Sequence, residues 1–130
     1  MVAPSRTVLL VEDNERNLKL ARDLLEFHGF TVLVATTGED ALTEASRSEP
    51  DLILMDLQLP GIDGRTALSR LRAQPGTAGI PVVALTAFAM AADRAQALEA
   101  GFDGYLEKPI SVRDFPQQVR QYLKGAPHDR

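Results

Sequence analysis

Short apolar runs alternate with longer, more polar segments along the chain. The runs occupy residues 7–11, 31–35, 51–55, 81–86 and 104–106 and are largely β-branched or aliphatic. Such runs are typical of buried strands, whereas the segments between them carry apolar residues at helical spacing. Strands that alternate with helices predict βα units around a parallel sheet.

Each segment after a strand has an apolar stripe that is expected to face the core. The stripe positions are Leu18, Ala21, Leu24 and Leu25; Ala41, Leu42 and Ala45; Ala67, Leu68 and Leu71; Ala92, Ala95 and Leu98; and Phe115, Val119, Tyr122 and Leu123. Residues three and four apart lie on one face of a helix, so these patterns predict five amphipathic helices.

Capping residues suggest where several helices begin and end. Asn14 and Thr37 are suited to be N-caps, and Gly29 is suited to end the first helix. Pro116 does not fit a last helix that begins directly after Ser111, because a proline there lacks a needed donor and clashes with the previous turn. We therefore expect the last helix to begin later or to be kinked.

Buried parallel strands need helices on both faces, and crossovers are right-handed. The expected fold is therefore a doubly wound α/β sandwich. In such folds the working site lies outside the carboxyl ends of the strands, where the strand order reverses. The residues that follow each strand are therefore the candidates for chemistry.

Five polar residues stand at these strand ends. They are Glu12, Asp13, Asp56, Thr86 and Lys108. Helix capping alone could explain any single acid, but caps need one short polar residue per helix and no lysine. The five together at one edge favour a functional site.

The chemistry of this set indicates a metal and a phosphoryl group. Two carboxylates about 4 Å apart repel by roughly 4 kcal/mol at an effective dielectric of 20, so the acids need a cation. Oxygen ligands without His or Cys favour Mg²⁺. Lys108 and the metal would neutralise phosphoryl oxygens, with Asp56 as an in-line carboxylate nucleophile.

Composition narrows the class of protein. The chain has 130 residues, a net charge of -4 and no cysteine, which excludes thiol chemistry and thiolate metal sites. Its first apolar run is too short for a signal peptide or a membrane span, so we expect a cytoplasmic protein without a membrane partner. Scattered basic residues and a pI of about 5.1 argue against nucleic-acid binding. We expect one domain over residues 1–130, with a core at about 6–124 and short flexible tails.

The ordered motifs of the chain resemble the response-regulator receiver domains of two-component signalling. The matching segments are VLLVEDN at 8–14, DLILMD at 51–56, LPGIDG at 59–64, ALTA at 84–87 and KP at 108–109. Residues 14–17, 86–90 and 108–112 most resemble the single-domain DivK-type regulators.

This resemblance implies a flavodoxin-like receiver fold with strand order 2-1-3-4-5 and assigns roles to single residues. Asp56 would accept a phosphoryl group from a histidine kinase or histidine phosphotransfer protein. The implied Mg²⁺ ligands are Glu12, Asp13, Asp56 and the backbone carbonyl of Gln58, although the family often has Asp where Glu12 stands. Thr86 and Lys108 would contact the phosphoryl oxygens, Thr86 and Tyr105 would form the switch, and a cis peptide bond would precede Pro109.

The resemblance also implies how the signal leaves the domain. Protein effectors would bind the face formed by the fourth helix, fifth strand and fifth helix. Too few residues follow the last helix for an output domain, so the protein would act by phosphorelay or by allosteric control of a kinase. Gln58 and Phe88 would border the path of the hydrolytic water, and the bulk of Phe88 is expected to prolong the phosphorylated state.

The residues argue against two other functions and leave a third open. A phosphatase of the haloacid-dehalogenase type uses an aspartyl phosphate but needs an acid where Gln58 stands, so the chain is not expected to be an enzyme beyond its own phosphorylation and slow dephosphorylation. A dinucleotide-binding domain would need Gly-x-Gly-x-x-Gly after the first strand. A receiver-like interaction module that does not use phosphate remains the alternative.

Overall fold

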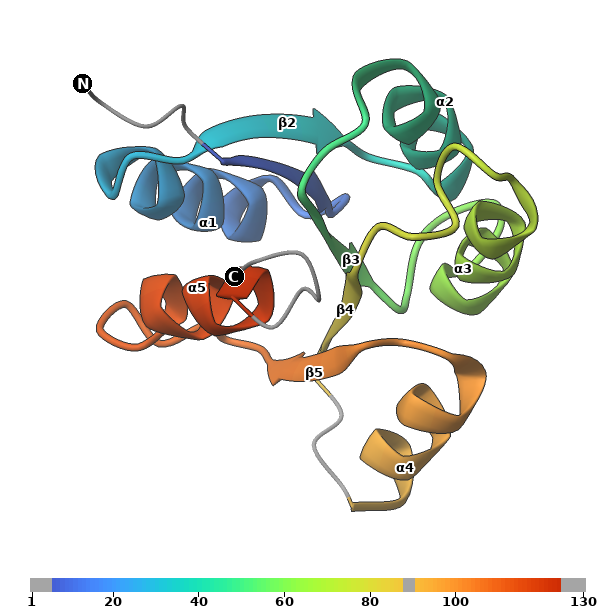
Figure 1. Cartoon of the computed structure of the whole chain (residues 1–130). Coiled ribbons are helices and arrows are strands. Elements are labelled where there is room, and N and C mark those ends of the chain that lie inside the picture. The colour runs from blue at the N-terminus through green and yellow to red at the C-terminus, as the bar shows by residue number, and fades with distance from the viewer. Residues whose placement is uncertain (1–5, 88–90, 125–130) are drawn as a thin grey trace.

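The computed structural model describes residues 6–87 and 91–124 and contains one parallel sheet (Figure 1). Its strand order is β2-β1-β3-β4-β5. The strands are β1 (Thr7–Val11), β2 (Thr31–Ala35), β3 (Leu52–Asp56), β4 (Val82–Thr86) and β5 (Gly104–Glu107). The order reverses between β1 and β3, which makes the carboxyl ends of these two strands the expected place for a site.

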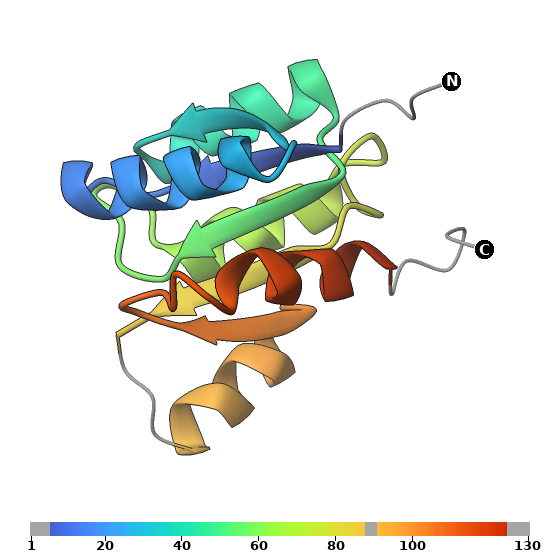
Figure 2. The ribbon, with the colours of Figure 1, turned by 90° about the vertical axis from the view of Figure 1, so that its left-hand side faces the viewer.

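Helices cover both faces of the sheet, which confirms the doubly wound α/β fold (Figure 2). The helices are α1 (Glu15–Phe27), α2 (Gly38–Ser48), α3 (Gly64–Ala73), α4 (Ala91–Ala100) and α5 (Phe115–Lys124). α1 and α5 pack on one face, and α2 and α3 pack on the other. α4 lies against β5 at the edge of the sheet (Figure 1).

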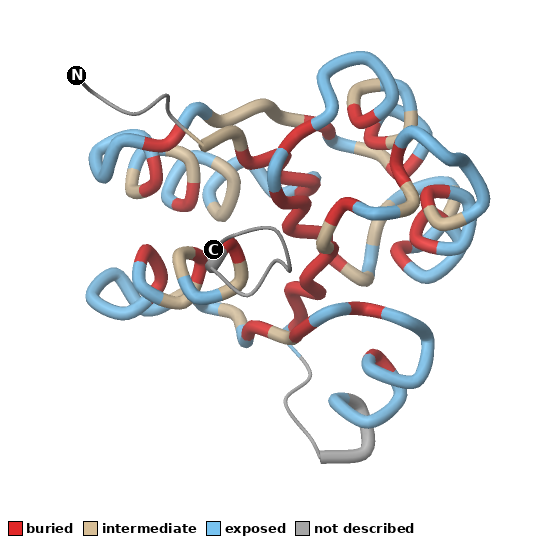
Figure 3. The backbone as a smooth tube through the Cα atoms, viewed as in Figure 1, coloured by how far each residue is buried: buried red, intermediate tan, exposed pale blue. Residues whose placement is uncertain are grey.

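The central strands are buried on both sides (Figure 3). Successive side chains of a strand point to opposite faces, and both faces are covered by helices here. Leu9 and Ile53 belong to the apolar cluster beneath α2 and α3, whereas Leu10 and Leu54 belong to the cluster beneath α1 and α5. This double burial explains why the strands are continuous apolar runs rather than alternating ones.

The strand boundaries differ from the expectation by one residue at four ends. β3 begins at Leu52 and includes Asp56, so that the acid is the last residue of the strand. Asp51 precedes β3, and its carboxylate accepts a hydrogen bond from the backbone amide of Thr7 at 2.7 Å. β4 begins one residue after Pro81, and β5 extends one residue further, to Glu107.

The expected caps of the first two helices are confirmed. The side chain of Asn14 accepts hydrogen bonds from the backbone amides of Arg16 and Asn17, each at 3.0 Å. Thr37 Oγ1 accepts one from the amide of Asp40 at 3.0 Å. Gly29 follows α1 with a positive φ of 92°, which favours glycine at this position.

The apolar stripe expected on α4 is wrong for its described side chains. Ala95 is exposed and Leu98 is 53% exposed, whereas Ala97 is fully buried. Three alanines and one leucine among residues 94–100 define no clear stripe, and a helix at the sheet edge has little apolar surface to cover. Periodicity alone therefore could not orient this helix.

Pro116 is accommodated because α5 begins late. The helix begins at Phe115, which places Pro116 in the first turn, where a backbone amide has no partner within the helix. A separate turn precedes it, in which Ser111 Oγ accepts a hydrogen bond from the amide of Asp114 at 3.2 Å. The expected late start is thus confirmed.

Candidate functional site

Three acids meet where β1 and β3 end. Val11 pairs with Met55 across these neighbouring strands, so the residues that follow, Glu12 and Asp56, lie side by side. One carboxylate oxygen from each of Glu12, Asp13 and Asp56 lies within 4.8 Å of the others. Glu12 and Asp56 are buried, whereas Asp13 is exposed, so the cluster faces solvent through Asp13.

Lys108 joins the two buried acids. Its ammonium Nζ lies 3.0 Å from Glu12 Oε1 and 2.8 Å from Asp56 Oδ2. The backbone amide of Lys108 donates to the carbonyl of Thr86 at 2.8 Å, which fixes the lysine beside the end of β4. The lysine therefore supplies the cation that the acid cluster needs when no metal is bound.

Backbone amides hold the second oxygen of each buried carboxylate. Asn14 donates its amide to Glu12 Oε2 at 3.1 Å, and Gln58 donates its amide to Asp56 Oδ1 at 2.9 Å. Each acid is thus bound at one oxygen by a backbone amide and at the other by Lys108. The Asp56 carboxylate is therefore fixed in orientation.

The pKa values of the cluster reflect its burial. Burial raises the pKa of Glu12, and the negative charge of Asp56 adds to this, although the hydrogen bonds from Lys108 and Asn14 oppose it. For Lys108, burial alone would lower the pKa, but the hydrogen bonds to Asp56 and Glu12 outweigh it and raise the pKa. Lys108 is therefore charged at neutral pH.

The donor set fits a hard divalent cation. Glu12, Asp13 and Asp56 offer only carboxylate oxygens, and three acids with one lysine leave two negative charges when all are ionised. Mg²⁺ prefers such oxygen ligands and retains water, which an exposed ligand such as Asp13 permits. Gln58 lies within reach of the same site, since its amide binds the Asp56 carboxylate.

Comparison with known proteins places this arrangement in a family. The family model of the response regulator receiver domain matches residues 8–120. The chain belongs to the response-regulator receiver family. Phosphorylation on aspartate and Mg²⁺ binding are typical of this family.

The relatives of this receiver agree with that assignment. It is 42% identical over 122 residues to the polar-differentiation response regulator DivK of Brucella ovis, covering 94% of this chain and 99% of DivK. A protein assigned as a response regulator in Chloroflexus aurantiacus has 33% identity and a TM-score of 0.86, covering 92% of this chain and 98% of that one. The receiver domain of a sensor histidine kinase from Pseudomonas aeruginosa has 35% identity and a TM-score of 0.84, with the same coverage, and its structure has a magnesium ion coordinated in the active-site cleft.

The other residues with expected roles that the structure describes lie on β4, on β5 or directly after β5. Thr86 is the buried last residue of β4, next to the strand that carries Asp56. Tyr105 is half-buried on β5. The peptide bond between Lys108 and Pro109 is cis. Phe88, for which a role in slowing hydrolysis was expected, lies outside the described residues.

Sequence reasoning missed a close approach of α3 to the acid. A Cβ atom on Gly64 would lie 2.8 Å from the carbonyl oxygen of Asp56 and 3.0 Å from Cα of Leu57. Glycine at this position therefore allows the first turn of α3 to contact the backbone that carries Asp56. The motif at 59–64 contains this glycine, but nothing in the sequence shows which backbone it meets.

We expect the metal-free receiver to lose stability as the pH rises above 4.5, the ordinary pKa of Glu12. Between pH 4.5 and the raised pKa of Glu12, the folded protein keeps a proton on Glu12 that the unfolded chain releases. Folding is therefore favoured at the lower pH and becomes less favourable as the pH rises. Mg²⁺ should raise the melting temperature and weaken this dependence, because the cation favours ionised carboxylates.

Thermal melts between about pH 5 and about pH 8, with EDTA or with Mg²⁺, measure both effects. Glu12→Gln is the matched control, since it cannot ionise and should lose its part of the pH dependence. A parent protein that responds neither to Mg²⁺ nor to pH in this window would contradict the close carboxylate cluster.

Proposed function

We propose that this receiver takes a phosphoryl group onto Asp56 from a phosphorylated histidine of a kinase or phosphotransfer protein, with Mg²⁺ as cofactor. The observation that carries the proposal is the binding of the Asp56 carboxylate between the Gln58 amide and Lys108, beside Glu12 and Asp13. A buried acid held in this way has one orientation and a neighbouring cation, both of which phosphoryl transfer needs.

In the transfer, an oxygen of Asp56 attacks phosphorus, the phosphorus–nitrogen bond breaks, and the histidine ring leaves with the bonding electrons. Mg²⁺, held by Glu12, Asp13, Asp56 and the carbonyl of Gln58, would neutralise charge on the phosphoryl oxygens. Lys108, whose ammonium lies 2.8 Å from Asp56 Oδ2, stabilises the same negative charge. The hydroxyl of Thr86 binds a phosphoryl oxygen after transfer.

An apolar patch on α1 supports a protein as the donor. Leu20, Leu24 and Phe27 line a concave surface of about 500 Å³ together with Arg16, Lys19 and Asp23. Leu20 is 41% exposed and Phe27 is 85% exposed, which is unusual for large apolar side chains on the outer face of a helix. α1 begins at Glu15, shortly after Glu12 and Asp13, so a donor bound along α1 would bring its phosphorylated histidine to Asp56.

Leu20→Ser combined with Phe27→Ser should slow phosphoryl transfer from a protein donor by about tenfold or more, because loss of apolar contact area lowers donor affinity. Phosphorylation by acetyl phosphate, which needs no docking surface, should stay unchanged. A phosphotransfer assay with a cognate kinase and a parallel acetyl phosphate assay separate the two. Val112→Ser, at another exposed apolar position, is the control and should transfer at the parent rate.

We propose that the output runs from Thr86 to Tyr105 and to the face formed by α4, β5 and α5. Phosphorylation adds about -1.5 to -2 charges and three acceptor oxygens beside Thr86. A Thr86 side chain drawn toward these oxygens makes room for the Tyr105 ring, and effector proteins then meet a changed surface. The net charge of -4 favours protein effectors over nucleic acid.

We propose that residues 6–124 form the functional receiver unit and that it works in the cytoplasm with its kinase. Among the described residues no helix is long and apolar enough to cross a membrane.

The test of the function is a phosphorylation assay with acetyl phosphate or phosphoramidate, with and without Mg²⁺, read by intact mass. We expect the mass of one phosphoryl group to be added only when Mg²⁺ is present. No gain under either condition would favour the phosphate-independent interaction module. Release of phosphate from small phosphoesters over many turnovers would instead favour a phosphatase.

A further inference from the structure

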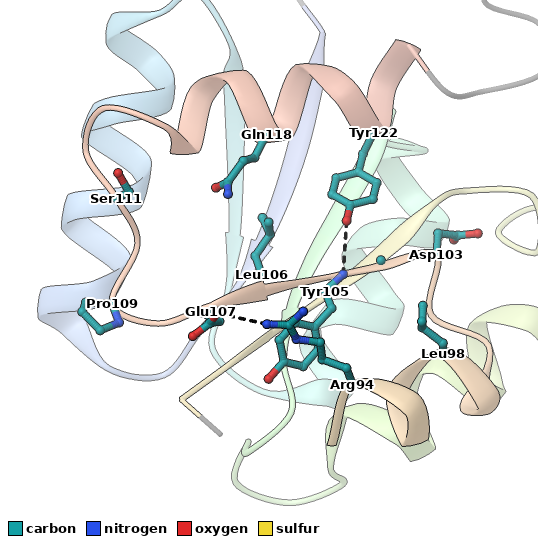
Figure 4. Close-up of a pocket in the computed structure, with 11 residues that line it drawn as sticks. Arg94, Leu98, Asp103, Tyr105, Leu106, Glu107, Pro109, Ser111, Gln118 and Tyr122 are labelled. Carbon is teal, nitrogen blue, oxygen red and sulfur yellow. Dashed lines mark hydrogen bonds and ion pairs between the residues drawn. The ribbon is translucent and has the colours of Figure 1, made fainter. Parts of the chain in front are cut away.

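A groove of about 620 Å³ runs along β5 between α4 and α5 (Figure 4). α4 contributes Arg94 and Leu98 to its lining, and α5 contributes Tyr122. Tyr105 and Glu107 of β5 lie between the two helices. The proposed switch residue, Tyr105, therefore lies where both helices can contact it.

The two walls of the groove hold different parts of Tyr105 (Figure 4). On the α5 side, the backbone amide of Tyr105 donates to the hydroxyl of Tyr122 at 3.3 Å. On the α4 side, the guanidinium carbon of Arg94 lies 5.6 Å from the centre of the Tyr105 ring, which is a cation–π distance. Arg94 Nη2 also lies 3.5 Å from Glu107 Oε1.

The contact with α5 does not depend on where the Tyr105 side chain points. Tyr122 binds the backbone, and its ring lies so close to Gly104 that any Cβ there would overlap it. The contact with α4 does depend on the side chain, because Arg94 meets the ring itself. A movement of the Tyr105 ring therefore breaks the Arg94 contact and leaves the Tyr122 contact in place.

We propose that Arg94 is a positioning residue that holds the Tyr105 ring in the groove and transmits its movement to the α4 wall. This inference rests on the proposed role of Tyr105 as the switch. When the ring leaves the groove, Arg94 loses its aromatic partner and keeps only Glu107, so the cationic side chain on the α4 wall is rearranged. The α5 wall, held through Gly104 and Tyr122, stays the same in both states.

By thermodynamic linkage, the contact between Arg94 and the Tyr105 ring opposes phosphorylation. A contact present only before the ring moves stabilises the unphosphorylated state, so its removal must favour phosphorylation by the same factor. An exposed cation–π contact corresponds to about a two- to fivefold change in an equilibrium. Arg94→Gln should therefore increase the population of the moved Tyr105 ring by about this factor.

The two tyrosines make the experiment direct, because the chain has only Tyr105 and Tyr122 and no tryptophan. Protein labelled with 3-fluorotyrosine gives two fluorine resonances, and Tyr122→Phe assigns the one from Tyr105. The resonance is followed in the parent, in Arg94→Gln, in Arg94→Lys and in Arg47→Gln, before and after acetyl phosphate with Mg²⁺. Arg47 is an exposed arginine on α2 that pairs with Glu44 at 2.8 Å and serves as the matched control.

We expect Arg94→Gln to shift the Tyr105 resonance of the unphosphorylated protein toward its phosphorylated position, because the population of the moved ring rises about two- to fivefold. Arg94→Lys should keep the Tyr105 resonance between its positions in the parent and in Arg94→Gln. Arg47→Gln should give the same resonance as the parent. An unchanged Tyr105 resonance in Arg94→Gln, with normal phosphorylation, would overturn the inference. A parent that takes up no phosphoryl group would instead refute the proposed function, and with it the signalling role of the contact.

Discussion

Asp56→Asn should take up no phosphoryl group from acetyl phosphate, whether or not Mg²⁺ is present. The asparagine amide is nearly isosteric with the carboxylate and retains an oxygen for the Gln58 amide, which donates to Asp56 at 2.9 Å. The fold is therefore kept, but the amide is a far weaker nucleophile than a carboxylate. Intact mass after incubation with acetyl phosphate measures phosphorylation, which we expect to be abolished completely.

Two further variants show whether the loss is specific. Asp13→Asn removes an exposed member of the cluster and should raise the Mg²⁺ concentration needed for phosphorylation without abolishing it. Asp40→Asn, at an exposed acid in the first turn of α2, should behave as the parent. A phosphoryl group found on Asp13 or Glu12 in the Asp56→Asn protein would show that the acceptor had been assigned wrongly.

The fold could be predicted closely because its three central strands, β1, β3 and β4, are buried on both faces. Runs such as residues 8–11 and 52–55 are fully buried, and only a strand between two helical layers needs such a run. The convergence of the acids also followed from topology, since parallel strands end at one edge. α4 could not be oriented, because Ala97 is buried while Leu98 is exposed, the reverse of what their sizes suggest.

The internal geometry of the site could not be predicted. A lysine that follows a strand can bind one acid, several or none, and only the structure shows Lys108 bound to both Glu12 and Asp56. The role of the Asn14 amide was equally hidden, because the sequence indicates a helix cap and not a donor to Glu12. Such contacts depend on side-chain rotamers and on turns of a few residues, which periodicity does not encode.

Lys108→Met should be the most destabilising of the substitutions considered for the metal-free protein. Lys108 is 14% exposed and binds two buried carboxylates, so its removal leaves both without a cation. Breaking a buried ion pair by removing one partner costs about 3 kcal/mol or more, which corresponds to roughly 10 °C in melting temperature. Denaturation in urea and thermal melts in EDTA measure the free energy of unfolding.

Lys19→Met is the matched control. Lys19 binds Asp23 at 2.7 Å, which is as short as the bonds of Lys108, but its side chain is 72% exposed. An exposed pair is screened by solvent and contributes little to stability, so this variant should unfold close to the parent. The difference between the two lysines then isolates the effect of burying the carboxylates.

Charge, rather than lost packing, is the reason for the expected instability of Lys108→Met, and two rescues distinguish the causes. Asp56→Asn combined with Lys108→Met removes one of the two uncompensated acids and should recover much of the lost stability, with a coupling that a double-mutant cycle measures. Mg²⁺ should also stabilise Lys108→Met more than the parent, because the added cation replaces the missing one. If neither rescue occurs, the loss comes from the packing of the lysine stem, and the carboxylates at the ends of β1 and β3 do not need a cation to remain together.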